Sequence, residues 1–432
     1  MTIHVPKLAR SFAELGATTH DRILNAVLIA LAALLPILIV FAHRGVAPVL
    51  LAMGLAAATR AGPWNAGMPF FLTRPRLSNP LARTGLLFLA FCLWTTIAGL
   101  WSPVEGAWRL SLNVGLPVLA AGAAIWEING RPSGELKPLA RAWTGAIAAA
   151  AALLVFEAAA GGYLRAIIPP TDQSPERMRD WISLGRGLTA LSTMLFAGLA
   201  LLVPVWRSKT AAALIFVGIF AAAARFSITA NVAGLAAGTI AFYAGRKWPR
   251  ATIIALAALA LLLLAAAPLA ALAPLDAIFA AAPEGLPASW LQRLVIWKTA
   301  AVEALGCLPL GCGADYARAL SEAGAVASIP GAAEALPALP IHPHNLFLEL
   351  WLEMGIPGVV LFGAALVGGA QALLARDFAK TAYAVIAATT AFVLVLAWLE
   401  MSIWQVWRVA AAGIAGVVLA LAIKMGGFAE KS

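Results

Sequence analysis

A group of polar residues opens one apolar stretch late in the chain. His342 and His344 flank a proline, and Asn345 follows where its side chain would cap a helix. Glu349 and Glu353 come one and two turns into the same predicted helix. A histidine has an ordinary pKa of about 6.5, so His344 can accept a proton near neutral pH. Carboxylates in an apolar helix are costly to bury and tend to mark function.

Three roles are open for the two histidines. As zinc ligands they would need a third ligand on the same face, and two histidines around a proline are not a helical metal motif. As structural residues they would hydrogen-bond to the backbone where the helix begins. As functional residues they would supply a general base or a phosphate contact, which the arginines of the chain favour. We therefore predict no metal and no cofactor.

Three arginines at the edges of apolar stretches point to a second kind of chemistry, the binding of an anion. Arg225 lies between two such stretches with almost no loop to solvate it, so its charge needs a partner or a water-filled cavity. Arg186 and Arg293 stand at similar edges. A guanidinium is always charged and its planar fork matches phosphate, so these arginines indicate anion recognition. The alternative is that each side chain only reaches lipid headgroups.

The composition requires that membrane helices position these residues. Of the 432 residues, 62% are hydrophobic and 12% are charged, whereas soluble domains have about 45–50% and roughly 25%. This excludes a soluble enzyme, a disordered chain and a fibrous repeat. We predict an all-α polytopic membrane protein with about 12 transmembrane helices in a single transmembrane domain, 1–432. The predicted spans are 23–42, 46–59, 85–101, 109–126, 142–160, 187–205, 211–224, 227–244, 251–272, 346–370, 382–399 and 408–424.

The basic residues predict the orientation of these spans, because cytoplasmic loops carry an excess of lysine and arginine. With the N-terminus inside, every inside loop has at least two basic residues, and Lys298 is the only lysine outside. Both termini are then cytoplasmic, while Arg186, Arg225 and Arg293 lie outside. This distribution accounts for the net charge of +10, so we predict no nucleic acid partner.

Residues 273–345 form the longest segment outside the predicted spans, and such a loop usually has a function or a fold of its own. Within it, 289–305 reads as an amphipathic helix with Ser289 as its N-cap. Arg293 and Trp297 share a face of this helix at i, i+4 spacing.

A turn is predicted directly after that helix, at Pro309, Gly311 and Gly313. Cys307 and Cys312 flank it on the predicted outside, where either a disulfide or two free thiols is open. The following residues, 323–341, are rich in alanine, proline and glycine, and we predict that they are mobile.

The His344–Asn345 pair, followed by Glu349, Glu353 and Gly355, resembles the signature of the O-antigen ligase and polymerase superfamily. The upstream pattern is similar as well: an arginine and a tryptophan on a loop helix, a Pro-Leu-x-Gly-x-Gly turn, and an arginine in a polar break between spans. The resemblance covers about residues 180–360. Family members often have a serine before the arginine of the polar break, where this chain has alanine.

The resemblance implies a GT-C-type glycosyltransferase in the inner membrane of a Gram-negative bacterium, with a large helical periplasmic loop and a periplasmic active site. It implies a glycan on undecaprenyl diphosphate as donor and a sugar hydroxyl of lipid A–core as acceptor. His344 is then expected to be the general base of an inverting transfer without metal or ATP, and Arg225 and Arg293 the other catalytic residues. The residues expected to bind or orient the substrates are Arg186, Trp297, His342, Asn345 and Glu353.

Three other functions share parts of this pattern. An O-antigen polymerase would use the same donor with a second lipid-linked glycan as acceptor. A protein O-oligosaccharyltransferase would transfer the glycan to serine or threonine of a protein. A transporter would have polar residues near the membrane centre and two similar halves, whereas the charges here cluster at one face and the halves differ.

Overall fold

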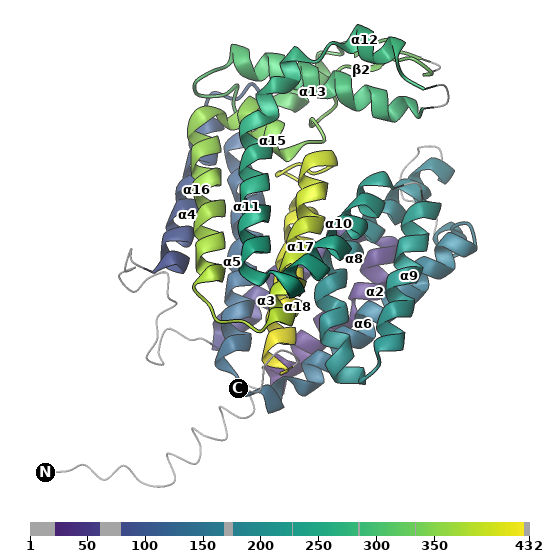
Figure 1. The fold of residues 1–432 in the computed structure, drawn as a ribbon, viewed down its shortest axis with the longest axis vertical. Coiled ribbons are helices and arrows are strands. Elements are labelled where there is room, and N and C mark those ends of the chain that lie inside the picture. The colour runs from purple at the N-terminus through teal and green to yellow at the C-terminus, as the bar shows by residue number, and fades with distance from the viewer. Residues whose placement is uncertain are drawn as a thin grey trace, which may run out of the picture. The chain divides into compact units, whose positions relative to one another are not determined.

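A computed structural model describes residues 22–60, 79–167, 176–226, 228–283, 286–332 and 334–426 of the chain. In this described part the only strands are β1 (Val326–Ala327) and β2 (Leu336–Pro337), which pair antiparallel. Nine of the described helical segments are long and apolar enough to cross a membrane. The protein is therefore an all-α polytopic membrane protein, as its composition predicts (Figure 1).

Each of the twelve predicted spans coincides with a helical segment. Three of these segments are not among the nine: α3 (Val46–Arg60), α9 (Lys209–Arg225) and α10 (Thr229–Lys247). The first two have only 15 and 17 residues, which is short for the hydrocarbon thickness of a bilayer. The total of about 12 transmembrane helices thus stays a prediction for these three.

The chain divides into two compact units. Unit 1 comprises residues 1–69, 117–228 and 410–432, and unit 2 comprises 70–116 and 229–409. The other helices of unit 1 are the segment Arg22–Phe41 with α2 (Leu35–Phe41), η1 (His43–Gly45), α6 (Ser133–Ala159), α7 (Tyr163–Ile167) and α8 (Glu176–Trp206). The predicted single transmembrane domain stays a prediction.

Unit 2 contains the segment with the histidine motif. Its helices besides α10 are α4 (Pro80–Ala98), η2 (Ala107–Arg109), α11 (Pro249–Ala266), η3 (Ala267–Leu272), α12 (Leu275–Ala280), α13 (Ala288–Gly306), α14 (Tyr316–Glu322), α15 (Leu346–Glu349), η4 (Leu350–Met354), α16 (Gly355–Leu374) and α17 (Lys380–Leu399). Two further helices, α5 (Leu110–Gly130) and α18 (Val406–Lys424), contribute residues to both units.

The long predicted loop, 273–345, is a small helical layer of unit 2. Its elements α12, α13 and β2 gather at one end of α11, α15 and α16 (Figure 1). Helix α13 confirms the predicted amphipathic helix, and its apolar face buries Ile296, Ala300 and Ala304. This face of α13 thus forms part of the hydrophobic core of the layer.

One detail of this layer differs from the predictions. Ser289 does not cap α13, because the helix begins at Ala288, directly after Pro287. The stretch 323–341 contains the paired strands β1 and β2, and its predicted mobility stays a prediction.

The helix that follows the histidine motif changes to a π-helical turn after its first four residues. Helix α15 passes into the π-helical turn η4 before α16 continues. Gly355 begins α16 with a φ of +60°, a left-handed value that glycine adopts without strain. π-Helical turns are frequent at functional sites, because they widen the backbone and redirect side chains.

Candidate active site

His344 lies in the turn that leads into α15. Asn345 caps that helix, as predicted: its Oδ1 accepts from the backbone N of Phe347 and Leu348 at 3.0 and 3.2 Å. The φ of His344 is +52°, in a region that a residue other than glycine adopts when its surroundings hold it there. The backbone N of His344 donates to Nδ1 of His342 at 3.2 Å, and the two rings meet edge-on with centroids 4.3 Å apart. The turn therefore holds the two rings together.

The segment between α17 and α18, together with the first turn of α18, supplies site residues that the sequence analysis missed. Nη2 of Arg408 donates to Oε1 of Glu400 at 3.1 Å, and the Arg408 guanidinium lies 4.6 Å from the centroid of the Trp407 ring. The side-chain amide of Gln405 contacts Nε2 of His342 at 3.0 Å. A glutamate and a glutamine between the last two predicted spans, and an arginine at the start of the last one, were a signal that could have found these residues.

Helix α13 brings Arg293 and Trp297 to the same place. The charges of Arg293 and Arg408 both act on His344, and both act on Glu400. We call His344, Glu400, Arg293 and Arg408 the His344 cluster. All four residues belong to unit 2. The ring of Trp297 stacks on that of Trp398, with centroids 6.0 Å apart and 27° between the ring planes.

Several buried polar atoms here have no hydrogen-bond partner among the described residues. They are Nε of Arg293, Nε1 of Trp297, Nδ1 of His344, Oε2 of Glu400, Oε1 of Gln405, and Nε and Nη1 of Arg408. Buried polar groups are nearly always hydrogen-bonded, so these atoms call for partners, which water or a bound ligand can supply. Most of these atoms are donors on guanidinium groups and an indole, a set that suits an anion with several oxygens.

The electrostatics of the cluster suit a base beside an anion site. Burial and the positive charge of Arg293 lower the pKa of His344 from 6.5 to about 4, although Glu400 opposes this effect. Burial alone would raise the pKa of Glu400, but Arg408, His344 and Arg293 together lower it. At neutral pH the cluster therefore holds a neutral imidazole, one carboxylate and two guanidinium groups. A neutral imidazole can take up a proton, and the excess of positive charge attracts an anion.

The two glutamates of the motif accept hydrogen bonds from the segments around the site. Glu349 accepts from Oγ of Ser402 at 2.6 Å and from the backbone N of Ile403 at 2.7 Å. Glu353 accepts from Nε1 of Trp404 and the backbone N of Asp315, both at 2.6 Å, and from the backbone N of Ala317 at 3.3 Å. The two carboxylates thus tie the motif helix to the segments before α14 and after α17. The predicted substrate role of Glu353 stays a prediction, and its contacts favour orientation of these segments.

We expect Glu353→Ala to lower the temperature at which the detergent-purified protein unfolds. The substitution removes the acceptor for the N–H groups of Asp315, Ala317 and Trp404, and each buried donor left unsatisfied costs about 1–3 kcal/mol. Tryptophan fluorescence during heating measures the transition. The exposed Glu322 on α14 provides the control Glu322→Ala, which should unfold as the wild type does. Equal transitions for both variants would contradict this role of Glu353.

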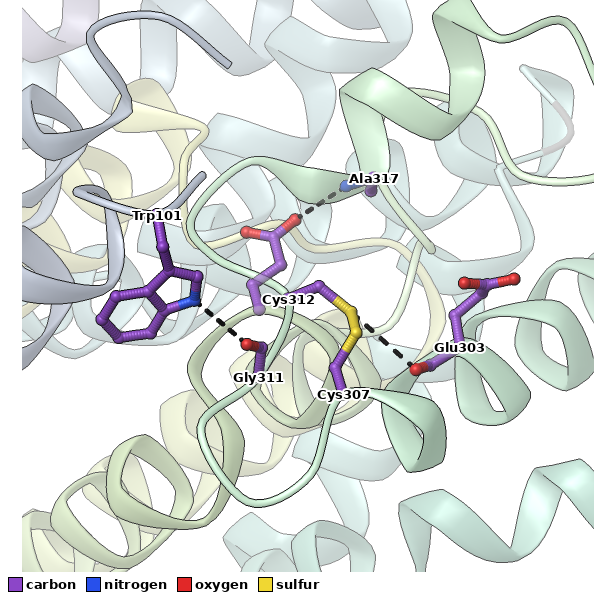
Figure 2. Close-up of a disulfide and its surroundings, with 7 residues drawn as sticks. Trp101, Glu303, Cys307, Gly311, Cys312 and Ala317 are labelled. Carbon is purple, nitrogen blue, oxygen red and sulfur yellow. Dashed lines mark hydrogen bonds between the residues drawn. A yellow bond between two sulfur atoms is a disulfide. The ribbon is translucent and has the colours of Figure 1, made fainter. Parts of the chain in front are cut away.

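A disulfide closes the turn after α13. Cys307 and Cys312 are bonded, which decides between the two alternatives that the sequence leaves open. Gly311 and Gly313 have φ values of +82° and +102°, as the predicted tight turn requires. Figure 2 shows the turn beside Trp101, whose Nε1 donates to the carbonyl of Gly311 at 3.1 Å.

The same turn docks on the π-helical turn η4. The backbone N of Cys312 donates to the carbonyl of Leu352 at 2.8 Å, and that of Gly313 to the carbonyl of Glu353 at 3.2 Å. One carboxylate oxygen of Glu353 also bonds to the Ala317 amide that Figure 2 labels. The disulfide therefore stiffens a loop that packs on the motif helix.

Arg186 and Arg225 lie in unit 1. Arg225 is the last residue of α9, and α10 begins at Thr229, which confirms the predicted break between two helices. On α8, Gly185 faces the side chain of Ile228, so both arginines stand at the same end of unit 1. Both side chains are exposed. Their predicted roles at a diphosphate stay predictions.

The described ranges contain no group of three or more His, Cys, Asp or Glu side chains arranged to hold a metal ion. The fold and the site define a class of protein: a polytopic helical membrane protein with a histidine and arginine site supported by a helical loop layer.

Comparison with known families then specifies this class. Residues 210–363 match the family model described as O-Antigen ligase. This match supports the resemblance of the motif to the family, which is one of glycosyltransferase-like membrane enzymes. No curated protein matches the chain. The matched segment includes Arg225, Arg293 and His344 and ends before Glu400 and Arg408.

Proposed function

We propose that the protein is an O-antigen ligase, which transfers a glycan from undecaprenyl diphosphate to a sugar hydroxyl of lipid A–core and so makes lipopolysaccharide. The His344 cluster is the observation that carries this proposal. It places a neutral imidazole beside two guanidinium groups whose buried donors have no partner among the described residues. The family match over 210–363 supports the class of reaction.

The proposed step is a direct displacement. The oxygen of the acceptor hydroxyl attacks the anomeric carbon of the donor glycan, and its proton passes to His344. The bond from that carbon to the diphosphate oxygen breaks, and the electron pair leaves with undecaprenyl diphosphate. The anomeric configuration is inverted, and no ATP is needed because the diphosphate is already a good leaving group. General-base help of this kind is worth about 10²–10⁴-fold.

The hydrogen bonds of His344 indicate which ring nitrogen takes the proton. The imidazole of His344 forms a hydrogen bond with the backbone of Glu400. Because the backbone N of Glu400 already donates to the carbonyl of Leu396 at 2.9 Å, the partner of the imidazole is the Glu400 carbonyl. The ring nitrogen that donates to this carbonyl carries the hydrogen. Nδ1, which has no partner in the described part of the chain, then carries the lone pair and is the proton acceptor.

Arg293 and Arg408 supply the positive charge that stabilises the leaving diphosphate in this proposal. For Arg186 and Arg225, roles at the diphosphate stay predictions from the resemblance. With guanidinium groups in this role, the proposed reaction uses no metal.

The disulfide supports the proposed orientation. Cys307–Cys312 lies in the loop layer beside the motif helix, and disulfides persist in the bacterial periplasm but are rare in the cytosol. We therefore propose that the site faces the periplasm and that both termini are cytoplasmic.

The test is a transfer reaction with the purified protein in detergent, with undecaprenyl-diphosphate-linked glycan as donor and without ATP. We expect glycan on lipid A–core when that acceptor is present. Longer glycans on the carrier, made without lipid A–core, would favour an O-antigen polymerase. Transfer to serine or threonine of a protein would favour a protein O-oligosaccharyltransferase. If no acceptor receives glycan, the proposed function is wrong, and transport is tested next.

A further inference from the structure

We propose that Glu400 binds a hydroxyl of the acceptor sugar, next to the hydroxyl that His344 deprotonates. This inference rests on the proposed function and adds to it the residue that receives the acceptor. Glu400 lies outside the segment that matches the family model. The contacts of the segment between α17 and α18 support this inference.

The two carboxylate oxygens of Glu400 have different surroundings. Oε1 accepts from Nη2 of Arg408 at 3.1 Å, whereas Oε2 is buried and has no hydrogen-bond partner among the described residues. An ionised carboxylate only accepts hydrogen bonds, so a ligand that completes this site must bring a donor. The oxygens of a diphosphate diester also only accept, and they match the guanidinium donors instead. A sugar hydroxyl can donate to Oε2 and remain beside the positively charged groups.

The position of Glu400 favours the acceptor over the donor glycan. Its backbone carbonyl bonds to the imidazole of His344, and its charge acts on the same ring, so a hydroxyl bound by its side chain lies close to the proposed base. Gln405 lies nearby through its contact with His342. Its Oε1, which has no partner among the described residues, can accept from another hydroxyl. The segment thus offers polar groups for neighbouring hydroxyls of one sugar.

An aromatic surface adjoins these polar groups. Trp398 is two residues before Glu400, its side chain is 41% exposed, and its ring stacks on that of Trp297. Sugar rings present C–H groups on their faces and hydroxyls at their edges. A tryptophan face beside a carboxylate therefore matches both parts of a sugar, in the way that binding sites combine apolar walls with a few polar groups.

The decisive experiment compares the acceptor and donor KM values of Glu400→Gln. The glutamine keeps the shape of the side chain and an oxygen for Arg408, but it can replace Oε2 with an N–H donor. We expect the KM for lipid A–core to rise about 10–100-fold, as for the loss of a hydrogen bond to a charged group, while the donor KM stays within about threefold. Glu400→Asp should restore part of the acceptor affinity. Glu322→Gln on α14 is the matched control and should leave both KM values unchanged.

Other outcomes would overturn the inference. A rise in the donor KM alone would mean that Glu400 acts through Arg408 on the diphosphate. Unchanged KM values for both substrates would mean that it contacts neither. If Glu400→Gln fails to fold, as judged by thermal unfolding, the same comparison is made with Glu400→Asp, for which we expect a smaller rise in the acceptor KM alone.

Direct binding of lipid A–core without donor separates this inference from the proposed function. Wild-type protein that binds lipid A–core without transferring glycan would contradict the proposed function. In that case, weaker binding by Glu400→Gln would still support the inference. Equal binding by the wild type and the variant, or no binding by the wild type, would contradict it.

Discussion

His344→Ala should abolish transfer of glycan to lipid A–core while the protein remains folded and inserted in the membrane. The imidazole is the group of the His344 cluster that is neutral and can take the hydroxyl proton, and its loss should lower kcat by about 10²–10⁴-fold. Initial rates at saturating donor and acceptor measure the effect. His344→Gln keeps a polar side chain but cannot take up a proton, so it should be equally impaired. Near-normal transfer by either variant would show that another group is the base.

The pH dependence of the wild type tests the same assignment without a substitution. In the free enzyme, burial and Arg293 lower the pKa of His344 to about 4, so the neutral base is present above that pH and is lost as the pH falls through it. A diphosphate bound beside Arg293 and Arg408 adds negative charge, which raises the pKa of His344.

The acid limb of kcat reports the enzyme–substrate complex, and that of kcat/KM reports the free enzyme. We therefore expect the limb of kcat to lie at higher pH than the limb of kcat/KM. Coincident limbs, or the reverse order, would mean either that His344 does not titrate in catalysis or that the diphosphate binds elsewhere.

Local sequence patterns predicted the parts of this site that depend on neighbouring residues. The spacing of Arg293 and Trp297 placed them on one face of α13, and Asn345 marked the start of α15, because helix periodicity and capping act within a few residues. Hydropathy likewise predicted twelve spans, and each of them coincides with a helical segment. Such features can be read from a sequence because the physical interaction spans a single helical turn.

The parts that the sequence did not predict depend on contacts between distant segments. Glu400 and Arg408 act on His344 only because the end of α17 and the start of α18 lie near the motif turn. The start of α13 also differed, because Pro287 set it in place of the predicted cap Ser289. A polar residue at a span edge looks the same in sequence whether it faces lipid headgroups or a site.

The two glutamates of the motif illustrate the same limit. Their positions in an apolar helix suggested function, because an unpartnered carboxylate there is costly. In the structure each of them accepts two or more hydrogen bonds, from Ser402 and Ile403 for Glu349 and from backbone amides and Trp404 for Glu353. These donors offset much of the cost of burial. The residues of the motif therefore differ in role: the glutamates connect segments of the fold, and the histidine is the residue to which we assign the proposed reaction.

Arg293→Lys should impair transfer even though it preserves the charge. Nε of Arg293 is buried without a partner among the residues that the structure describes, so it is available to a phosphate oxygen together with the other nitrogens of the guanidinium. Lysine has a single charged nitrogen and cannot form this planar fork. Loss of one charge-assisted hydrogen bond should lower kcat/KM for the donor by about 10–100-fold. Steady-state kinetics with varied donor at a fixed concentration of lipid A–core measure this change.

The matched control is Arg376→Lys, because Arg376 is exposed just beyond the end of α16. It should transfer glycan at the wild-type rate. Lysine would replace a charge that only attracts the donor. Wild-type turnover of Arg293→Lys would therefore mean that Arg293 does not bind the diphosphate through its planar fork and that other residues bind it. A selective rise in the donor KM, with the acceptor KM unchanged, would instead separate the role of Arg293 from that proposed for Glu400. The two variants together thus assign the donor to Arg293 and the acceptor to Glu400.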